Sequence, residues 1–158
     1  MITVYSDGGS RGNPGKSAYA IVVVEDGEVI CEQAEFLGIH TNNYAEYRGL
    51  IAGICKVIEL GADEAEFVMD SELVIKQMTG VYKVKSENVK DLYQDARSLS
   101  SQIRKVSFRN VRRSQELIPR ADALLNAELD RHRFDSLSCR PDRRSSPGSA
   151  RRIPCRAM

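Results

Sequence analysis

Several features that would place this sequence in a common class of protein are missing. It has no run of about 18 or more apolar residues, so we expect no membrane-spanning helix. A strand-like segment, residues 2–6, begins at once, without the basic and apolar regions of a secretory signal. No internal repeat is visible either. These absences favour a globular domain that works away from membranes.

Cysteine is scarce and is not spaced for metal binding. The four cysteines, at positions 31, 55, 139 and 155, include no CxxC pair, so a zinc site is not predicted. Cys31 and Cys55 lie in apolar runs and are expected to be small buried hydrophobic residues. This usage fits a reducing compartment, and we expect a cytoplasmic location.

The charge is divided unevenly along the chain. The 158 residues carry a net charge of +1, but residues 131–158 hold eight Arg and two Asp, which leaves −5 for the remainder. An acidic body argues against broad phosphate binding by charge alone, and it fits clustered carboxylates that a metal ion would neutralise. We predict one folded domain, residues 1–132. The Arg, Ser and Pro content of residues 133–158 predicts a disordered tail.

The pattern of apolar residues predicts nine elements. Strands are expected over 2–7, 18–25 and 28–37, with Asp26-Gly27 as a hairpin turn between the last two. Helix signals and further strands follow at 43–60, 66–70, Ser71 to about Gly80, 86–103, 105–111, and from about Pro119 onward. The order β-β-β-α-β-α-α-β-α predicts an α/β fold, a five-stranded mixed sheet flanked by helices.

Four acidic residues occupy positions that the predicted fold would bring together. Asp7 ends the first strand and Asp70 ends the fourth, so the two would lie side by side if these strands are parallel neighbours. Glu46 lies on the apolar face of the first helix, near its beginning, and therefore points at the sheet. Asp122 opens the last helix on its apolar stripe.

Crowded carboxylates repel each other unless a cation compensates them, and hard oxygen ligands of this kind select Mg²⁺ or Mn²⁺. Two such ions about 4 Å apart can promote hydrolysis of a phosphodiester. Each acid alone also has a simpler interpretation, namely a turn residue for Asp7, a helix cap for Asp70 or Asp122, and a solvated helix acid for Glu46. Those interpretations do not explain a convergence of all four.

In order and in local context, these acids resemble the motifs of ribonuclease H type 1, in its compact bacterial and archaeal form. The likeness rests on YSDGGSRGNPG at 5–15, TNNYAEYRGL at 41–50, MDSELVIKQM at 69–78 and ADALLN at 121–126, and it covers about residues 1–131. The resemblance implies a ribonuclease H-like fold. It also implies an endoribonuclease that hydrolyses the RNA strand of RNA/DNA hybrids, and a monomer is expected.

By this resemblance, the catalytic residues and metal ligands are the four acids, which would hold two Mg²⁺ ions, with Mn²⁺ as the alternative metal: Asp7, Glu46, Asp70 and Asp122. It further implies that the substrate is held by residues that read RNA 2′-hydroxyls or bind a DNA phosphate, namely Gly8, Gly9, Ser10, Asn13, Thr41, Asn42 and Asn43. Asn42 and Asn43 can equally be explained as helix caps, and the two roles are compatible.

The sequence departs from the family pattern in two places. No histidine lies between residues 41 and 131, although many members carry one on a loop before the last acid. Arg112, Arg113 or Arg120 is a candidate replacement. Residues 113–121 also lack the usual asparagine and carry Leu117-Ile118 instead, which puts the loop geometry in question. The basic handle that some members use to grip hybrids is reduced to Lys83 and Lys85.

Three alternatives remain open at this point. Gly15-Lys16-Ser17 weakly resembles a phosphate-binding loop, but Ser10 stands where such a loop needs glycine. A second alternative is a catalytically weakened module that binds hybrids without cutting them. In the third, the chain is the nuclease part of a larger fused enzyme, with the basic tail as a linker or a nucleic-acid-attracting arm.

Overall fold

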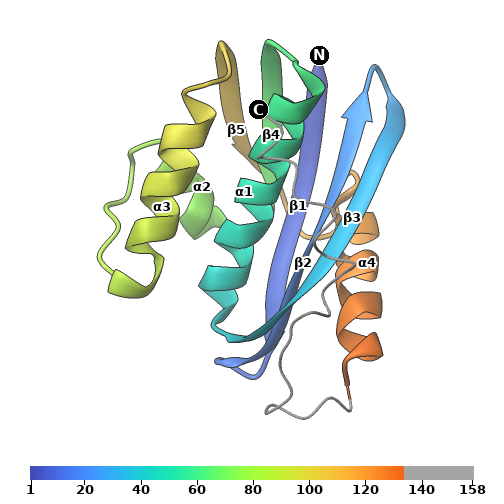
Figure 1. Cartoon of the computed structure of the whole chain (residues 1–158), viewed down its shortest axis with the longest axis vertical. Helices are drawn as coiled ribbons and strands as arrows, with labels where there is room; N and C mark the ends of the chain where they lie inside the picture. Colours follow the sequence, from blue (N-terminus) through green and yellow to red (C-terminus); the bar gives the residue numbers. More distant parts are fainter. Residues whose placement is uncertain (134–158) are drawn as a thin grey trace.

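The structure is a computed structural model, and it describes residues 1–133 (Figure 1). The prediction of a disordered tail concerns residues 133–158, of which all but Arg133 lie outside the described part. The elements, in chain order, are β1 (Ile2–Arg11), β2 (Gly15–Glu25), β3 (Glu28–His40), α1 (Asn42–Leu60), β4 (Glu64–Met69), α2 (Glu72–Met78), α3 (Glu87–Ser100), β5 (Lys105–Asn110) and α4 (Ile118–Arg131).

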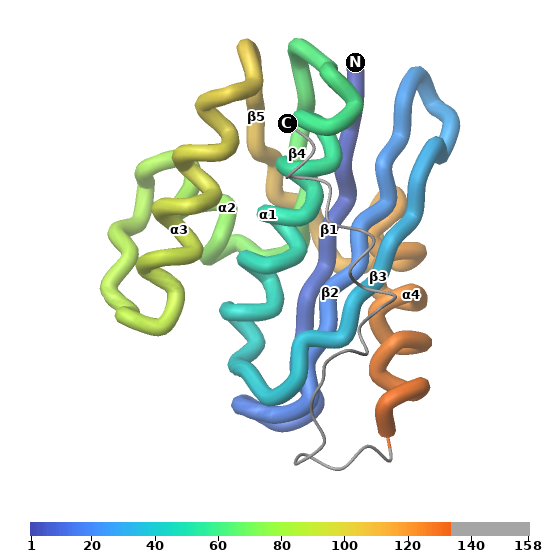
Figure 2. Tube along the Cα trace, viewed as in Figure 1, coloured from blue at the N-terminus to red at the C-terminus, as the bar shows by residue number. Residues whose placement is uncertain are grey.

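The predicted order of elements and the five-stranded mixed sheet are confirmed. The sheet has the order β3-β2-β1-β4-β5, in which β1, β2 and β3 pair antiparallel while β4 pairs parallel to both β1 and β5. Helix α1 carries the chain from the β3 edge across to β4, as the trace in Figure 2 shows. The parallel pairing of β1 with β4 is the condition under which Asp7 and Asp70 were expected to meet.

Helices cover both faces of the sheet. Because side chains alternate along each strand, each face of the central strands carries apolar side chains that a helix buries. Val4 of β1 belongs to the core beneath α1, together with Leu50 and Ile54. Its neighbour Tyr5 points to the opposite face and packs with α4. Each face of the central strand is therefore buried, and β1 is held between two helices that both carry candidate acids.

Helix α1 begins and ends with standard capping chemistry. The Thr41 hydroxyl oxygen accepts a hydrogen bond from the Tyr44 N–H at 3.2 Å, and Gly61 ends the helix in the left-handed conformation with φ of 72°. Close contact with β1 depends on glycine at Gly53, where a Cβ atom would lie 2.7 Å from Val4 Cγ1. The small residues of this helix thus bring Glu46 near the sheet.

Strand β1 is longer than expected, which corrects the prediction that it ends at Asp7. Pairing with β4 stops at Tyr5, but antiparallel pairing with β2 continues to Arg11. Gly8 and Gly9 are therefore strand residues and not a turn. The chain reverses at 12–14, and the following Gly15-Lys16-Ser17 belongs to β2. A phosphate-binding loop needs a helix at that point, so this alternative is wrong.

Three further observations concern the start of α4, the length of the helices and the burial of two cysteines. Helix α4 begins at Ile118, so Asp122 lies about one turn inside the helix and does not open it. No helix within residues 1–133 is long and apolar enough to cross a membrane. Cys55 is buried, as expected, while Cys31 is only partly buried.

Candidate active site

The first pair of acids meets because β1 and β4 run parallel and in register. Tyr5 lies opposite Val68, and two residues further along each chain are Asp7 and Asp70. Asp7 is only 4% exposed, and the Asp70 side chain is 12% exposed. The prediction that these two carboxylates lie together is confirmed by the lining of one pocket that contains both.

Glu46 enters the same pocket from α1, on the face of the sheet opposite to Tyr5. Its approach depends on Gly8, because a Cβ atom there would lie 2.4 Å from the carbonyl carbon of Ala45 and 2.6 Å from the Glu46 nitrogen. No side chain other than hydrogen fits that contact. Asn42, one turn earlier in α1, donates from Nδ2 to Glu46 Oε2 at 3.1 Å.

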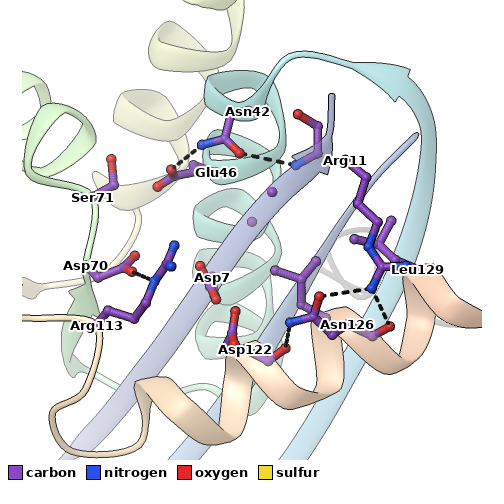
Figure 3. A pocket seen from close by; sticks show the side chains of 14 residues that line it. Asp7, Arg11, Asn42, Glu46, Asp70, Ser71, Arg113, Asp122, Asn126 and Leu129 are labelled. Atoms are coloured by element: carbon purple, nitrogen blue, oxygen red, sulfur yellow. Dashed lines mark hydrogen bonds and ion pairs between the residues drawn. The ribbon is translucent and has the colours of Figure 1, made fainter. Parts of the chain in front are cut away.

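Asp122 comes from α4 and completes the group of four. Figure 3 shows its carboxylate below that of Asp7, with Glu46 above and Asp70 to one side. The Asp122 carbonyl accepts a hydrogen bond from Asn126 Nδ2 at 2.9 Å, and Arg11 NH2 donates to Asn126 Oδ1 at 3.1 Å. A chain of polar contacts thus ties this part of α4 to the end of β1.

The buried carboxylates resist ionisation. Burial, together with the negative charges of Asp70, Asp122 and Glu46, raises the pKa of Asp7 from 3.8 to about 8. Burial is also the main reason why the pKa of Glu46 rises to about 7. One oxygen of each, Asp7 Oδ2 and Glu46 Oε1, is buried without a hydrogen-bond partner. Such oxygens need a proton or a cation.

The donor set fits a hard divalent cation. Carboxylate oxygens are the ligands that Mg²⁺ and Mn²⁺ prefer, and two of those present are buried and unpaired. Within the described residues, no group of three or more His, Cys, Asp or Glu side chains is already arranged around one ion position. A cation held by all four carboxylates would therefore require them to draw closer together.

Two arginines line the pocket, and one of them, Arg113, pairs with an acid of the group. Arg113 Nε lies 3.5 Å from Asp70 Oδ2, although its side chain is 78% exposed (Figure 3). Arg113 was one of three arginines considered as a replacement for the missing loop histidine, and it is the one of the three that lines the pocket. Arg11 was not foreseen as a site residue. It shares the strand face of Asp7 and Gly9, a signal that the expected turn at Gly8-Gly9 concealed.

The residues predicted to contact substrate fall into two groups. Asn42 joins two of them, since its Oδ1 accepts from the Ser10 N–H at 3.1 Å and its own N–H donates to Asn13 Oδ1 at 3.0 Å. The pocket is lined by Gly8, Gly9, Ser10 and Asn42, while Asn13, Thr41 and Asn43 are not part of its lining. Their contact with substrate stays a prediction.

Comparison with known proteins agrees with the fold and with the family that the sequence resembles. A family model described as "Reverse transcriptase-like" matches residues 5–125. The bifunctional protein Rv2228c of Mycobacterium tuberculosis is 44% identical over 131 residues, which cover 82% of this chain and 35% of that protein. Ribonuclease HI of Halobacterium salinarum is 38% identical over 130 residues, which cover 82% of this chain and 64% of the relative. The chain thus spans between about a third and two thirds of these curated relatives.

Solved structures give the same picture at the level of the backbone. The crystal structure of RNase H1 from Halobacterium salinarum superposes with a TM-score of 0.78 at 38% identity, covering 82% of this chain and 98% of that one. A second structure is of LC11-RNase H1 in complex with an RNA/DNA hybrid. It has a TM-score of 0.76 at 34% identity and covers 83% of this chain and 98% of that one.

Proposed function

Because this chain belongs to the ribonuclease H type 1 family, we propose that it is a metal-dependent endoribonuclease that hydrolyses the RNA strand of RNA/DNA hybrids. The observation that carries the proposal is the gathering of four carboxylates in one pocket. The buried, unpaired oxygens of Asp7 and Glu46 support it, because they call for a cation. The complex of LC11-RNase H1 with a hybrid supports the choice of substrate.

The four acids would hold two divalent cations, Mg²⁺ or alternatively Mn²⁺. Asp7 would lie at the centre of this ligand set, since the charges of Glu46, Asp70 and Asp122 raise its pKa and the three side chains lie around it. When bound, the cations supply the positive charge that promotes attack of water on the phosphodiester and stabilises the leaving oxygen. The products would be a 3′-hydroxyl and a 5′-phosphate.

The polar residues around α1 would position the hybrid. Asn42 and the N–H of Ser10 are already joined by a hydrogen bond, so this edge of the pocket is ordered before substrate arrives. Ser10, Asn13, Asn42 and Asn43 would then read 2′-hydroxyls, the groups that distinguish RNA from DNA. Thr41 at the start of α1 would hold a DNA phosphate, because helix N-termini favour anions. Gly8 and Gly9 would form part of the pocket wall against which the hybrid lies.

The test is direct. Purified protein is incubated with a labelled RNA/DNA hybrid, duplex DNA and duplex RNA, each with and without Mg²⁺. We expect cleavage of the hybrid's RNA strand only, and only with the cation. Asp70→Asn, which removes one ligand charge without changing the size of the side chain, serves as the inactive comparison. Cleavage of the hybrid in EDTA at the same rate would contradict the proposed metal dependence.

Two alternatives have a specific observation in their favour. The altered loop 113–121 supports a module that binds hybrids without cutting them, and binding without Mg²⁺-dependent cleavage would select it. The bifunctional name of Rv2228c, and the 35% of its length that this chain spans, support a nuclease part that works within a larger fused enzyme. An antibody raised against residues 1–133 detects the protein in its native cells. The mass of the detected polypeptide distinguishes a fused enzyme from a separate nuclease chain. The same cells, fractionated, test the cytoplasmic location.

A further inference from the structure

A second charged cluster lies beside the active site, and nothing in the proposed reaction uses it. Arg109, on the edge strand β5, binds two carboxylates at once. Its Nε donates to Glu66 Oε2 of β4 at 2.9 Å, and its NH1 and NH2 donate to the two oxygens of Glu116 at 2.6 and 3.0 Å. Paired donors of this kind define the orientation of both partners.

The same cluster reaches β1 through a buried tyrosine. The Tyr5 hydroxyl donates to Glu116 Oε1 at 2.8 Å, across 111 positions of the sequence. Tyr5 is 9% exposed and precedes Asp7 by two residues, so both side chains point to the same face of β1. We call Tyr5, Glu66, Arg109 and Glu116 the Arg109 clamp. It joins three neighbouring strands to the loop 111–117.

Glu116 occupies a backbone conformation that does not suit it. Its φ angle of 54° lies in the left-handed region, where a non-glycine residue such as glutamate costs about 1 kcal/mol or more. Glycine or asparagine would be better tolerated there. The hydrogen bonds that the Glu116 carboxylate accepts from Tyr5 and Arg109 offset the energetic cost of this backbone conformation. A residue that only had to turn the chain would not need this carboxylate.

The loop that contains Glu116 also carries Arg113 and is followed directly by the helix that carries Asp122. Arg113, three residues before Glu116, is the residue whose Nε lies 3.5 Å from Asp70. Ile118, two residues after Glu116, is fully buried against the sheet and begins α4. Asp122 follows one turn later. Glu116 thus lies between the residue that reaches Asp70 and the helix that carries Asp122.

We propose that the Arg109 clamp is a positioning device for the active site. By fixing Glu116 against Tyr5 and Arg109, it sets the distance of Asp122 from Asp7 and keeps Arg113 within reach of Asp70. The inference rests on the proposed function, since it gives Asp122 the role of a metal ligand. Because the four acids must draw together around a cation, an error in the placement of α4 weakens cation binding directly.

The test compares Glu116→Gln and Tyr5→Phe with a matched control, Glu64→Gln. Glu64 also lies on β4 and pairs with an arginine, Arg104, at 3.2 Å, but at the end of the strand away from the pocket. Three measurements are made on each protein. Calorimetry gives the affinity for Mn²⁺ without nucleic acid, kinetics on a hybrid give kcat and KM, and thermal unfolding gives the unfolding temperature. Circular dichroism follows unfolding, because the chain has no tryptophan.

We expect Glu116→Gln to lower the Mn²⁺ affinity and kcat about tenfold each, the usual effect of losing a residue that orients a metal ligand. KM should change less than about twofold, because the hybrid contacts lie around α1. Tyr5→Phe, which removes one hydrogen bond, should act in the same direction with a smaller effect. Glu64→Gln should match the wild type in all three measurements.

A purely stabilising role would give another pattern. If Glu116→Gln lowers the unfolding temperature but leaves the Mn²⁺ affinity and kcat of the folded protein unchanged, the positioning role is refuted. The same holds if Glu64→Gln reduces affinity and kcat as much as Glu116→Gln. A wild-type protein that binds no Mn²⁺ and cuts no hybrid would overturn the proposed function and the clamp together. If the wild type binds Mn²⁺ and cuts the hybrid, and Glu116→Gln does so equally well, only the positioning role of the clamp is refuted.

Discussion

Replacing Asp7 by asparagine should stabilise the fold in the absence of divalent cations. Asp7 is buried, and the charges of its three acidic neighbours oppose its ionisation, so its pKa rises from 3.8 to about 8. Between those two pH values the folded protein keeps a proton that the unfolded chain releases. The free energy of unfolding of the wild type therefore falls as pH rises from about 4 to about 8. Asparagine has the shape of the protonated acid and does not titrate.

The size of the effect follows from the same pKa. At about 1.4 kcal/mol per pKa unit, the difference between 3.8 and about 8 corresponds to at most about 6 kcal/mol at pH 8 and above. The buried amide brings its own desolvation cost of about 1–3 kcal/mol. We therefore expect Asp7→Asn to be about 3 kcal/mol more stable than the wild type at pH 8, which raises the unfolding temperature by about 10 °C for a domain of this size.

The assay is thermal unfolding in EDTA at pH 5 and pH 8, repeated in 10-fold steps of Mg²⁺ at pH 8. The advantage of Asp7→Asn should be large at pH 8 and small at pH 5. Mg²⁺ should raise the unfolding temperature of the wild type and not that of the variant, because only the wild type binds the cation tightly. Asp91→Asn, at an exposed acid of α3, controls for the loss of one negative charge. An advantage that is the same at both pH values, or a less stable variant at pH 8, would refute the reasoning.

Three further predictions follow from single contacts. Asp70→Asn should abolish Mg²⁺-dependent cleavage of a hybrid while the circular dichroism spectrum stays that of the wild type; full activity would remove Asp70 from the site. Gly8→Ala places a methyl group 2.4 Å from the Ala45 backbone, so urea unfolding should show a loss of about 1–3 kcal/mol or more, and a loss below about 0.5 kcal/mol would show that α1 can move away freely. The Arg109 guanidinium lowers the pKa of Glu116 from 4.5 to about 2, so the stability that this carboxylate contributes is present above about pH 4.5 and disappears as pH falls toward 2. The stability difference between the wild type and Glu116→Gln should shrink over that range, and a difference that persists unchanged at pH 2 would contradict the assignment.

Local patterns were sufficient to predict the elements and the central pair of acids. Alternating apolar residues and capping residues are short-range signals, so the strands around Val4 and the helix after Thr41 could be read from a few neighbouring positions. The meeting of Asp7 with Asp70 followed from one assumption, parallel pairing of the first and fourth strands. Glu46 could be placed because its helix has an apolar face. Placing Asp7 beside Asp70 needed this one assumed contact between distant segments, whereas the elements themselves needed none.

Two errors came from contacts between distant segments. Strand β1 was ended too early because two consecutive glycines indicate a turn, whereas Gly8 is a strand residue that makes room for the backbone of Ala45. The reason for this glycine lies 37 positions away in α1 and leaves no local trace. Arg11 was missed for the same reason, since a residue beyond a turn is not expected to share the face of Asp7.

The loop before Asp122 shows most clearly what the sequence alone could not predict. Its sequence lacks the asparagine that the family resemblance leads one to expect, and Leu117-Ile118 predicts a disturbed geometry. In the structure Ile118 fills the core under α4, and the polar anchoring comes from Glu116 instead. Tyr5 is far from the loop in sequence, whereas Arg109 lies only two residues before it. A missing motif residue therefore does not show that the loop lacks an anchor. Loss of the asparagine can be neutral where a tyrosine and an arginine on the sheet hold the same loop, and the Mn²⁺ affinity of Glu116→Gln decides whether they do.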